Sequence, residues 1–185
     1  HGLSDGEADL RVGRRFAVAR RVAGLFASYA VQRLGVLEAW NAGRDEDGCG
    51  HPVPGDLAWQ PALWRRVVAE VGGPAPDQRH RETLARLRDD PASFDLPDRV
   101  SLFGHTRIAA TEVDLLGALG DHRDVHLWLP HPSAALWDAL APLAAEGPVA
   151  RAADRSFEGA HHPLLVSLGR DVRELQRTLA GAAGP

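Results

Sequence analysis

Residues 99–119 have the order of a strand, a loop and a helix, which is the order that surrounds the nucleotide in many ATPases. The apolar run Val100–Phe103 would be the strand, and Gly104 begins the loop. An ATPase needs an acidic residue at the end of such a strand to hold magnesium, and a second carboxylate to position water. Gly104 and His105 stand there instead, and the nearest downstream carboxylate, Glu112, already belongs to the helix. The sequence predicts the framework of a nucleotide site without its catalytic groups.

A phosphate-binding loop is excluded as well. All 21 basic residues of the chain are arginine, whereas the G-x-x-x-x-G-K-[ST] loop requires a lysine that reaches the phosphates. We interpret the arginine bias as the mark of a GC-rich genome, so only the positions of individual arginines carry information about function.

Three histidines lie close together in "DHRDVHLWLPHP": His122, His126 and His131. They are the residues on which a stand-alone metal-dependent hydrolase would be built, and this reading is kept as an alternative. In a strand, alternation places His126 on the opposite face from Val125 and Leu127, and no spacing of the H-E-x-x-H kind occurs. The prediction is that these are loop and sheet-edge histidines, with no metal ligands in this segment.

Candidate nucleophiles lack the surroundings that would activate them. Ser101, Ser133 and Ser167 have no G-x-S-x-G context, and Cys49 lies in a glycine-rich loop. No catalytic residue is therefore predicted.

The arginines are the one feature of the sequence that suggests a binding partner. They gather between Arg14 and Arg21, with Arg33, Arg65 and Arg66 further along. Two readings stay open, because helical arginines on a surface are commonly just solvated, yet they also contact phosphates.

The elements that must position these residues follow from periodicity and from breakers. Helices are expected at Arg15–Trp40, from Pro61 to Gly72, at Gln78–Asp89, at Glu112–Leu119, from Ala134, and from Pro163 to about Leu179. Strands are expected at Val100–Phe103 and Val125–Leu129. A strand, helix, strand order implies parallel strands with a right-handed crossover. The fold class is therefore α/β, with a mainly helical subdomain at 1–96 and an α/β lobe at 97–185.

Several helix ends can be specified. Pro61 fits the first position of its helix, with Trp59 and Trp64 spaced as a hydrophobic staple. Asp77 is expected to cap the helix that starts at Gln78, and Thr111 the helix that starts at Glu112.

Bulk composition sets wider limits. The chain has 185 residues, 44% of them apolar, a formal net charge of −4 and a single cysteine. No apolar run is long enough to span a bilayer, so a reduced, cytoplasmic protein without a membrane partner is expected. Two strands are too few for a self-sufficient sheet, and no methionine occurs. We expect a segment of a longer protein whose remaining strands lie elsewhere.

Four ordered blocks resemble one family, the RecC or gamma subunits of exodeoxyribonuclease V, and its actinobacterial members in particular. The blocks are "RRFAVARRVAGLFASYAVQRLGVLEAWNAG", "DLAWQPALWRRVV", "LPDRVSLFGHTRIAATEVDLLGALGDHRDVHLWLPHPSAALWD" and "HHPLLVSLGRDVRELQ". They cover nearly all of the chain from Arg14 to Gln176.

The resemblance implies a degenerate superfamily 1 helicase fold that has lost ATP hydrolysis. The segment would belong to the N-terminal helicase-like region of a scaffold subunit. It would work with RecB-like and RecD-like motor subunits, which use ATP and magnesium, in double-strand break repair and homologous recombination. It would bind double-stranded and single-stranded DNA and guide the single strands, with recognition of the hotspot Chi left open.

Site residues are carried over from the family pattern D-L-F-D-x-Y-x-x-Y-R-P. Leu25 and Arg33 stand at matching positions, whereas Gly24, Ala27 and Leu34 replace the two acids and the proline. A second family arginine falls near the start of the third expected helix. Arg81 is the best candidate for it and Arg79 the next.

Two further alternatives remain at this point. One is an AddB-type helicase and nuclease subunit, whose C-terminal cysteine cluster and nuclease carboxylates are not visible in this sequence. The other is a module that only holds the motor subunits together and does not touch DNA.

Overall fold

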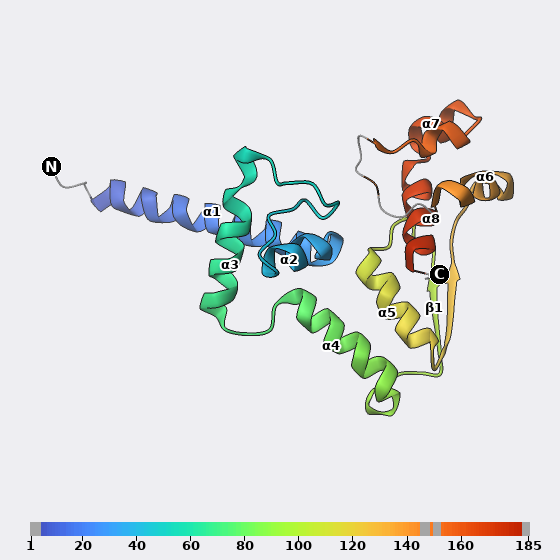
Figure 1. Ribbon diagram of the computed structural model, residues 1–185, viewed down its shortest axis with the longest axis horizontal. Coiled ribbons are helices and arrows are strands. Elements are labelled where there is room, and N and C mark those ends of the chain that lie inside the picture. The colour runs from blue at the N-terminus through green and yellow to red at the C-terminus, as the bar shows by residue number, and fades with distance from the viewer. Residues whose placement is uncertain (1–4, 145–148, 150–152, 183–185) are drawn as a thin grey trace. The chain divides into compact units, whose positions relative to one another are not determined.

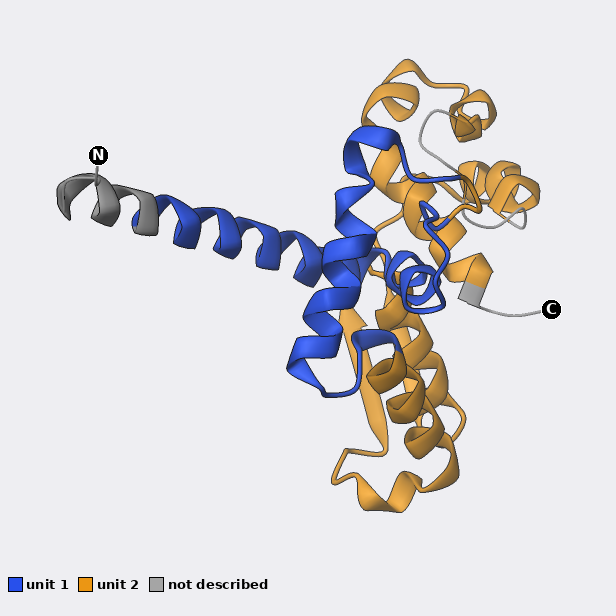
Figure 2. Ribbon diagram, turned by 60° about the vertical axis from the view of Figure 1, so that its left-hand side comes forward, with its two compact units in different colours: residues 1–48, 52–77 blue, residues 49–51, 78–185 orange. Residues whose placement is uncertain are grey.

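The computed structural model of the chain describes residues 5–144, 149 and 153–182 (Figure 1). It is mostly helical with one small parallel sheet, which confirms the coarse α/β prediction. The chain forms two compact units (Figure 2). The first unit comprises residues 1–48 and 52–77, and the second comprises 49–51 and 78–185. The expected domain boundary between 96 and 97 stays a prediction. Among the described helices, none is long and apolar enough to cross a membrane.

The first unit is built from helices around an aromatic core. Its elements are α1 (Asp5–Gln32), α2 (Leu34–Asn41), the 3-10 helix η1 (Gly55–Leu57) and α3 (Trp59–Val71). Phe26, Leu37, Trp40 and Trp64 are buried together, with the Phe26 and Trp64 ring centroids 5.3 Å apart in an edge-on arrangement. The Trp64 indole donates a hydrogen bond to Asn41 Oδ1 at 2.8 Å. The C-terminal end of α2 is therefore tied to α3.

The single helix expected at Arg15–Trp40 is wrong in one respect, because it breaks at Arg33. That residue has φ −147° and ψ 48°, outside the helical region. The break redirects the chain so that Val36, Leu37 and Trp40 reach the same core as Phe26. Apolar spacing continues across the break, which is why periodicity alone joins the two helices.

Helix α3 begins earlier than its proline suggests. Trp59 is its first residue and Pro61 its third, so Trp59 is not the outside half of a staple; its side chain is 46% exposed. Proline is tolerated there because N–H groups of the first turn have no intrahelical acceptor. The predicted end is confirmed: Gly72 takes the left-handed conformation with φ +66°, and its N–H donates to Val68 O.

Helix α4 (Pro76–Asp89) also starts before the expected Gln78, and Asp77 lies inside its first turn. Asp77 is buried, and its Oδ1 accepts a hydrogen bond from Asn41 Nδ2 at 2.6 Å. Further along, His80 Nε2 lies 3.3 Å from Asp114 Oδ2, and Arg88 Nε lies 3.2 Å from Asp121 Oδ2. The 3-10 helix η2 (Pro91–Ser93) follows.

The sheet of the second unit consists of β1 (Arg99–Phe103) and β2 (Asp124–Trp128), joined by α5 (Ala110–Gly120). The two strands are parallel, as the sequence predicts, and Val100 pairs with Val125. Leu127 packs on one face of the sheet against Ile108, Val113 and Leu175.

The start of α5 differs from the expectation. Ala109, not Thr111, is the N-cap, and Glu112 Oε2 accepts a hydrogen bond from the Ala109 N–H at 2.8 Å. Glu112 therefore supplies the return half of a capping box, because its longer side chain reaches back over one turn.

The C-terminal part of the second unit contains α6 (Ala134–Ala144), the 3-10 helix η4 (Ser156–Gly159), α7 (Pro163–Leu168) and α8 (Arg170–Ala182). Pro163 occupies the first position of α7, as predicted. The single last helix is wrong, since the chain breaks at Gly169. A Cβ at this position would collide with the carbonyl oxygen of Leu165, so glycine permits the close approach.

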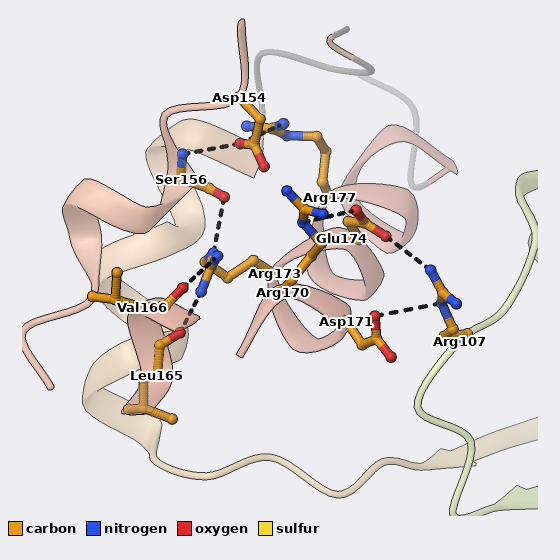
Figure 3. A network of polar contacts seen from close by, with 10 residues as sticks. All are labelled: Arg107, Asp154, Ser156, Leu165, Val166, Arg170, Asp171, Arg173, Glu174 and Arg177. Carbon is orange, nitrogen blue, oxygen red and sulfur yellow. Dashed lines mark hydrogen bonds and ion pairs between the residues drawn. The ribbon is translucent and has the colours of Figure 1, made fainter. Parts of the chain in front are cut away.

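A buried arginine fastens α7 to α8 (Figure 3). Arg173 Nε donates to Ser156 Oγ at 3.1 Å, and its terminal nitrogens donate to the carbonyl oxygens of Leu165 and of Val166. Burial lowers the pKa of the Arg173 guanidinium, which still remains charged. The guanidinium thus adds donors to two carbonyl groups near the end of α7, where the Leu165 oxygen also accepts the Gly169 N–H.

Asp154 and Arg177 form the neighbouring ion pair, with Oδ1 and Nη1 3.2 Å apart and both side chains about 15% exposed. Asp154 Oδ1 also accepts a hydrogen bond from Ser156 N at 2.9 Å. Burial by itself raises the pKa of the Asp154 carboxyl, but the Ser156 hydrogen bonds and the Arg177 charge together hold it below its ordinary value.

Candidate nucleic-acid interface

The ends of the two strands carry none of the groups that hydrolyse ATP. β1 ends at Phe103, and the N–H of the following Gly104 donates to Trp128 O at 2.9 Å. β2 ends at Trp128 and continues into Leu129 and Pro130. Glu112 is held at the start of α5 by the Ala109 N–H. Carboxylates of this sheet, such as Asp124, lie at the opposite, N-terminal end of the strands.

The three histidines are separated rather than clustered. His122 Nε2 lies 2.9 Å from the carbonyl oxygen of Arg88, to which it donates. His126 stacks on Trp128 with centroids 6.3 Å apart, and His131 meets Trp137 edge-on at 5.1 Å. Within the part of the chain that the structure describes, no group of three His, Cys, Asp or Glu side chains could share a metal ion.

Two of the three candidate nucleophilic serines serve local structure. Ser133 Oγ accepts a hydrogen bond from Leu136 N at 3.0 Å and so caps α6. Ser167 Oγ donates to Pro163 O within α7 at 3.0 Å. Ser101 is exposed on β1, and Cys49 is exposed in its loop.

The arginines of α1 do not form a single basic face. Arg14, Arg15, Arg20 and Arg21 are all exposed. Helical geometry places Arg14, Arg15 and Arg21 on the half of the helix that also carries Val18, whereas Arg20 projects from the opposite side. Arg20 therefore lies apart from the other three arginines.

An apolar groove of about 530 Å³ lies between α1 and α3. Its walls are Val18, Ala19, Val22, Ala23 and Phe26 from α1, and Leu63 and Val67 from α3, with Arg14 and Arg15 at its rim. The floor offers apolar surface and no hydrogen-bonding side chain. Such a surface suits an apolar side chain better than a sugar-phosphate backbone.

The two arginines of α3 differ from each other. Arg65 Nη1 donates to Asp45 Oδ1 at 2.8 Å and to Trp40 O at 3.2 Å, so its charge is already partnered. Arg66 is exposed and, among the residues that the structure describes, its side chain has no ion pair.

Leu25 and Arg33 lie near the C-terminal end of α1. Leu25 is half-buried, next to the buried Phe26. Arg33 is exposed at the helix break; its Nη2 donates to the carbonyl oxygen of Asp47 at 2.9 Å, and its guanidinium lies 5.8 Å from the centre of the Tyr29 ring. Arg33 therefore already stabilises the loop that follows α2.

Arg79 and Arg81 belong to the second unit and project from α4. Both are exposed, and their spacing of two residues directs them to different sides of the helix. Over residues 5–144, 149 and 153–182, the Arg79 side chain has no hydrogen bond or ion pair. His80 between them faces Asp114 of α5, which fixes the rotation of α4 and leaves these arginines accessible.

Two features of the first unit could not be predicted from the sequence. The groove arises only when α3 packs on α1, and the Arg33 contact with Asp47 reaches across α2 to a loop with no periodicity. One sequence signal does point to the groove. The apolar stripe of α1 includes Val18, which α2 does not cover.

Comparison with known proteins assigns the family. The model of the RecC N-terminal domain matches residues 8–184. The RecBCD enzyme subunit RecC of Mycobacterium tuberculosis H37Rv is 60% identical over 180 residues, which are 97% of this chain and 16% of that protein. The same subunit of Mycolicibacterium smegmatis is 53% identical (94% and 15%), and that of Escherichia coli is 31% identical (89% and 15%). The chain thus spans about one sixth of the length of these relatives. It belongs to the RecC family and corresponds to the family's N-terminal domain.

Proposed function

We propose that this chain is a non-catalytic, DNA-binding scaffold region of a RecBCD-type helicase and nuclease complex, acting in double-strand break repair and homologous recombination. The relatives' name places them in the RecBCD enzyme. The chain would work with RecB-like and RecD-like motor subunits in the cytoplasm, and those subunits would use ATP and magnesium.

The observation that carries the proposal is the pair of strand ends without carboxylates. A helicase lobe would contain a parallel unit like β1, α5, β2, with magnesium and water held where Gly104 and His105 stand. Glu112 is engaged with the Ala109 N–H. This favours a degenerate helicase-like lobe whose task is to bind and position.

DNA contact is proposed for the arginines of α4. Arg79 and Arg81 are exposed on a helix whose rotation is fixed by His80 and Asp114. Arginine forks bind phosphate oxygens well, and a fixed helix loses little entropy when it does so. Leu25 and Arg33 are proposed as a second contact in the first unit, with Arg33 acting partly through the loop that it holds. Recognition of Chi stays open, because Gly24 and Ala27 replace the acids of the family pattern.

A second candidate is a module that holds partner subunits without touching DNA. The groove between α1 and α3 favours it, because its walls are apolar and only Arg14 and Arg15 at the rim are charged.

The salt dependence of single-strand binding by the assembled complex separates the two candidates. Each phosphate contact to a single strand contributes about 0.7 to the slope of log affinity against log salt. The double variant Arg79→Ala, Arg81→Ala should therefore lose about 0.7 to 1.4 of that slope. The control is Arg155→Ala, an exposed arginine paired with Glu158 at 3.1 Å. An unchanged slope in a complex that assembles normally would reject the DNA contact and favour the docking module.

A further inference from the structure

Three side chains of the first unit meet where α2 ends and α4 begins. The Trp64 indole Nε1 donates a hydrogen bond to Asn41 Oδ1 at 2.8 Å, and Asn41 Nδ2 donates to Asp77 Oδ1 at 2.6 Å. Asn41 is the last residue of α2, Trp64 lies in α3, and Asp77 lies in the first turn of α4. One amide group therefore joins three helices.

The two partners of Asn41 require opposite hydrogen-bonding groups. An indole N–H only donates, and a carboxylate only accepts. The Asn41 side chain meets both requirements, because it carries a carbonyl oxygen and an NH2 group on the same carbon. Trp64 and Asp77 are buried, whereas Asn41 is exposed. A substitution at position 41 therefore changes the two hydrogen bonds without opening the aromatic core.

The contact with Asp77 bears on the arginines of α4. This helix starts in the first unit, and its residues from Gln78 onward belong to the second. Arg81 follows Asp77 by four residues, which is about one helical turn, so both side chains project from the same side of α4. Rotation of the first turn about the helix axis would turn the Arg81 guanidinium by the same angle.

This part of α4 is held at two points. Asn41 holds the first turn through Asp77, and three residues later His80 Nε2 lies 3.3 Å from Asp114 Oδ2. A guanidinium fork binds phosphate oxygens in a defined geometry. An arginine on a helix that is already held in place therefore binds at a smaller entropy cost than one on a frayed first turn.

We infer that Asn41 is a positioning residue for the strand contact of α4, and that it acts through Asp77 without touching DNA itself. The inference rests on the proposed DNA contact of Arg79 and Arg81, and it adds a residue that lies outside α4. A residue that only stabilised the first unit would affect strand binding equally whether or not the two arginines were present. That difference makes the role testable.

The single-strand affinity of the assembled complex, measured for Asn41→Asp in three backgrounds, tests the inference. The substitution keeps the acceptor for Trp64 and replaces the donor to Asp77 with a second carboxylate oxygen. In the wild-type background we expect the affinity to fall about fivefold. With Asp77→Asn already present, the new carboxylate gains a donor, and the loss should be less than about twofold. With Arg79→Ala and Arg81→Ala present, the loss should again be less than about twofold, because the groups to be positioned are gone.

Asn41→Ala is the second variant, since it removes both hydrogen bonds without adding charge, and it should lose about threefold in affinity. If Asn41→Asp hinders assembly, Asn41→Ala gives the same comparison with the arginine variants. An equal loss in all three backgrounds, no loss in the wild-type background, or a full loss with Asp77→Asn present would overturn the role of Asn41 and leave the DNA contact intact. Wild-type affinity in the double variant of Arg79 and Arg81 would instead overturn the DNA contact, and the inference with it.

Discussion

The Glu112 carboxylate accepts a hydrogen bond from the Ala109 backbone N–H at 2.8 Å, which closes the first turn of α5. In a hydrolytic lobe, a carboxylate in this region would face a magnesium ion and water. Here it satisfies a donor that the helix start leaves without a partner. Glu112, the carboxylate nearest downstream of the β1 end, therefore caps a helix in this protein.

Replacing this acid should cost stability. Glu112→Ala removes the acceptor for the Ala109 N–H and should lower the free energy of unfolding by about 1 kcal/mol. Glu112→Gln keeps a carbonyl oxygen at the same place and should lose less than half of that. Chemical denaturation of the purified protein measures both, and equal losses in the two variants would contradict a capping role.

A matched pair of glycine substitutions tests the backbone of the first unit. Gly72→Ala places a side chain in the left-handed conformation at the end of α3 and should cost about 1 kcal/mol. Gly24→Ala lies inside α1, where an added Cβ meets nothing within 4 Å, and should stabilise by about 0.5 to 1 kcal/mol. Thermal unfolding should shift in opposite directions; a shift of the same sign for both would be inconsistent with the two conformations.

The sequence predicts an element or its end correctly where a single residue type or a short apolar run determines it. Gly72 ends α3, Pro163 starts α7, and the apolar runs at Val100 and Val125 form parallel strands. Each of these outcomes depends on the residue's own conformational limits or on alternation along a strand.

The breaks in the long helices could not be predicted in the same way. Arg33 interrupts the first helix because α2 packs on Trp64. Gly169 interrupts the last helix because α8 packs so that its Arg173 contacts Ser156 and Val166. Arg33 and Asp47 are fourteen positions apart, with α2 and part of the following loop between them. Such outcomes are decided by tertiary packing, which periodicity does not register.

The Asp154 carboxyl should make stability depend on pH. Its pKa in the folded protein lies below the ordinary value of 3.8, so its contribution is fully present above that value and is lost as pH falls through the lower folded pKa. Asp154→Asn should therefore be less stable than wild type by about 1 kcal/mol at neutral pH. The difference should close at acid pH below 3.8. Asp138→Asn, an exposed carboxylate on α6, is the control and should change stability by less than about 0.5 kcal/mol.

Arg33 should act as a structural residue as well as a site residue. Arg33→Ala removes the donor to Asp47 O and the stacking on Tyr29, and should lower the free energy of unfolding by about 1 kcal/mol. Hydrogen exchange of the loop after α2 should increase in parallel. Arg79→Ala is the matched control, since that side chain lacks a hydrogen bond or ion pair among the described residues. Equal hydrogen exchange of this loop in the two variants would show that Arg33 does not stabilise it.

Photo-cross-linking to single-stranded DNA in the assembled complex tests directly whether α4 contacts the strand. A benzophenone side chain replaces Ala85, which is exposed one turn after Arg81, or the exposed Ala135 of α6 as control. We expect that position 85 cross-links to the strand, that the yield falls when Arg79 and Arg81 are alanine, and that position 135 gives only background. Equal yields at positions 85 and 135, or a yield at position 85 that does not depend on the two arginines, would contradict it.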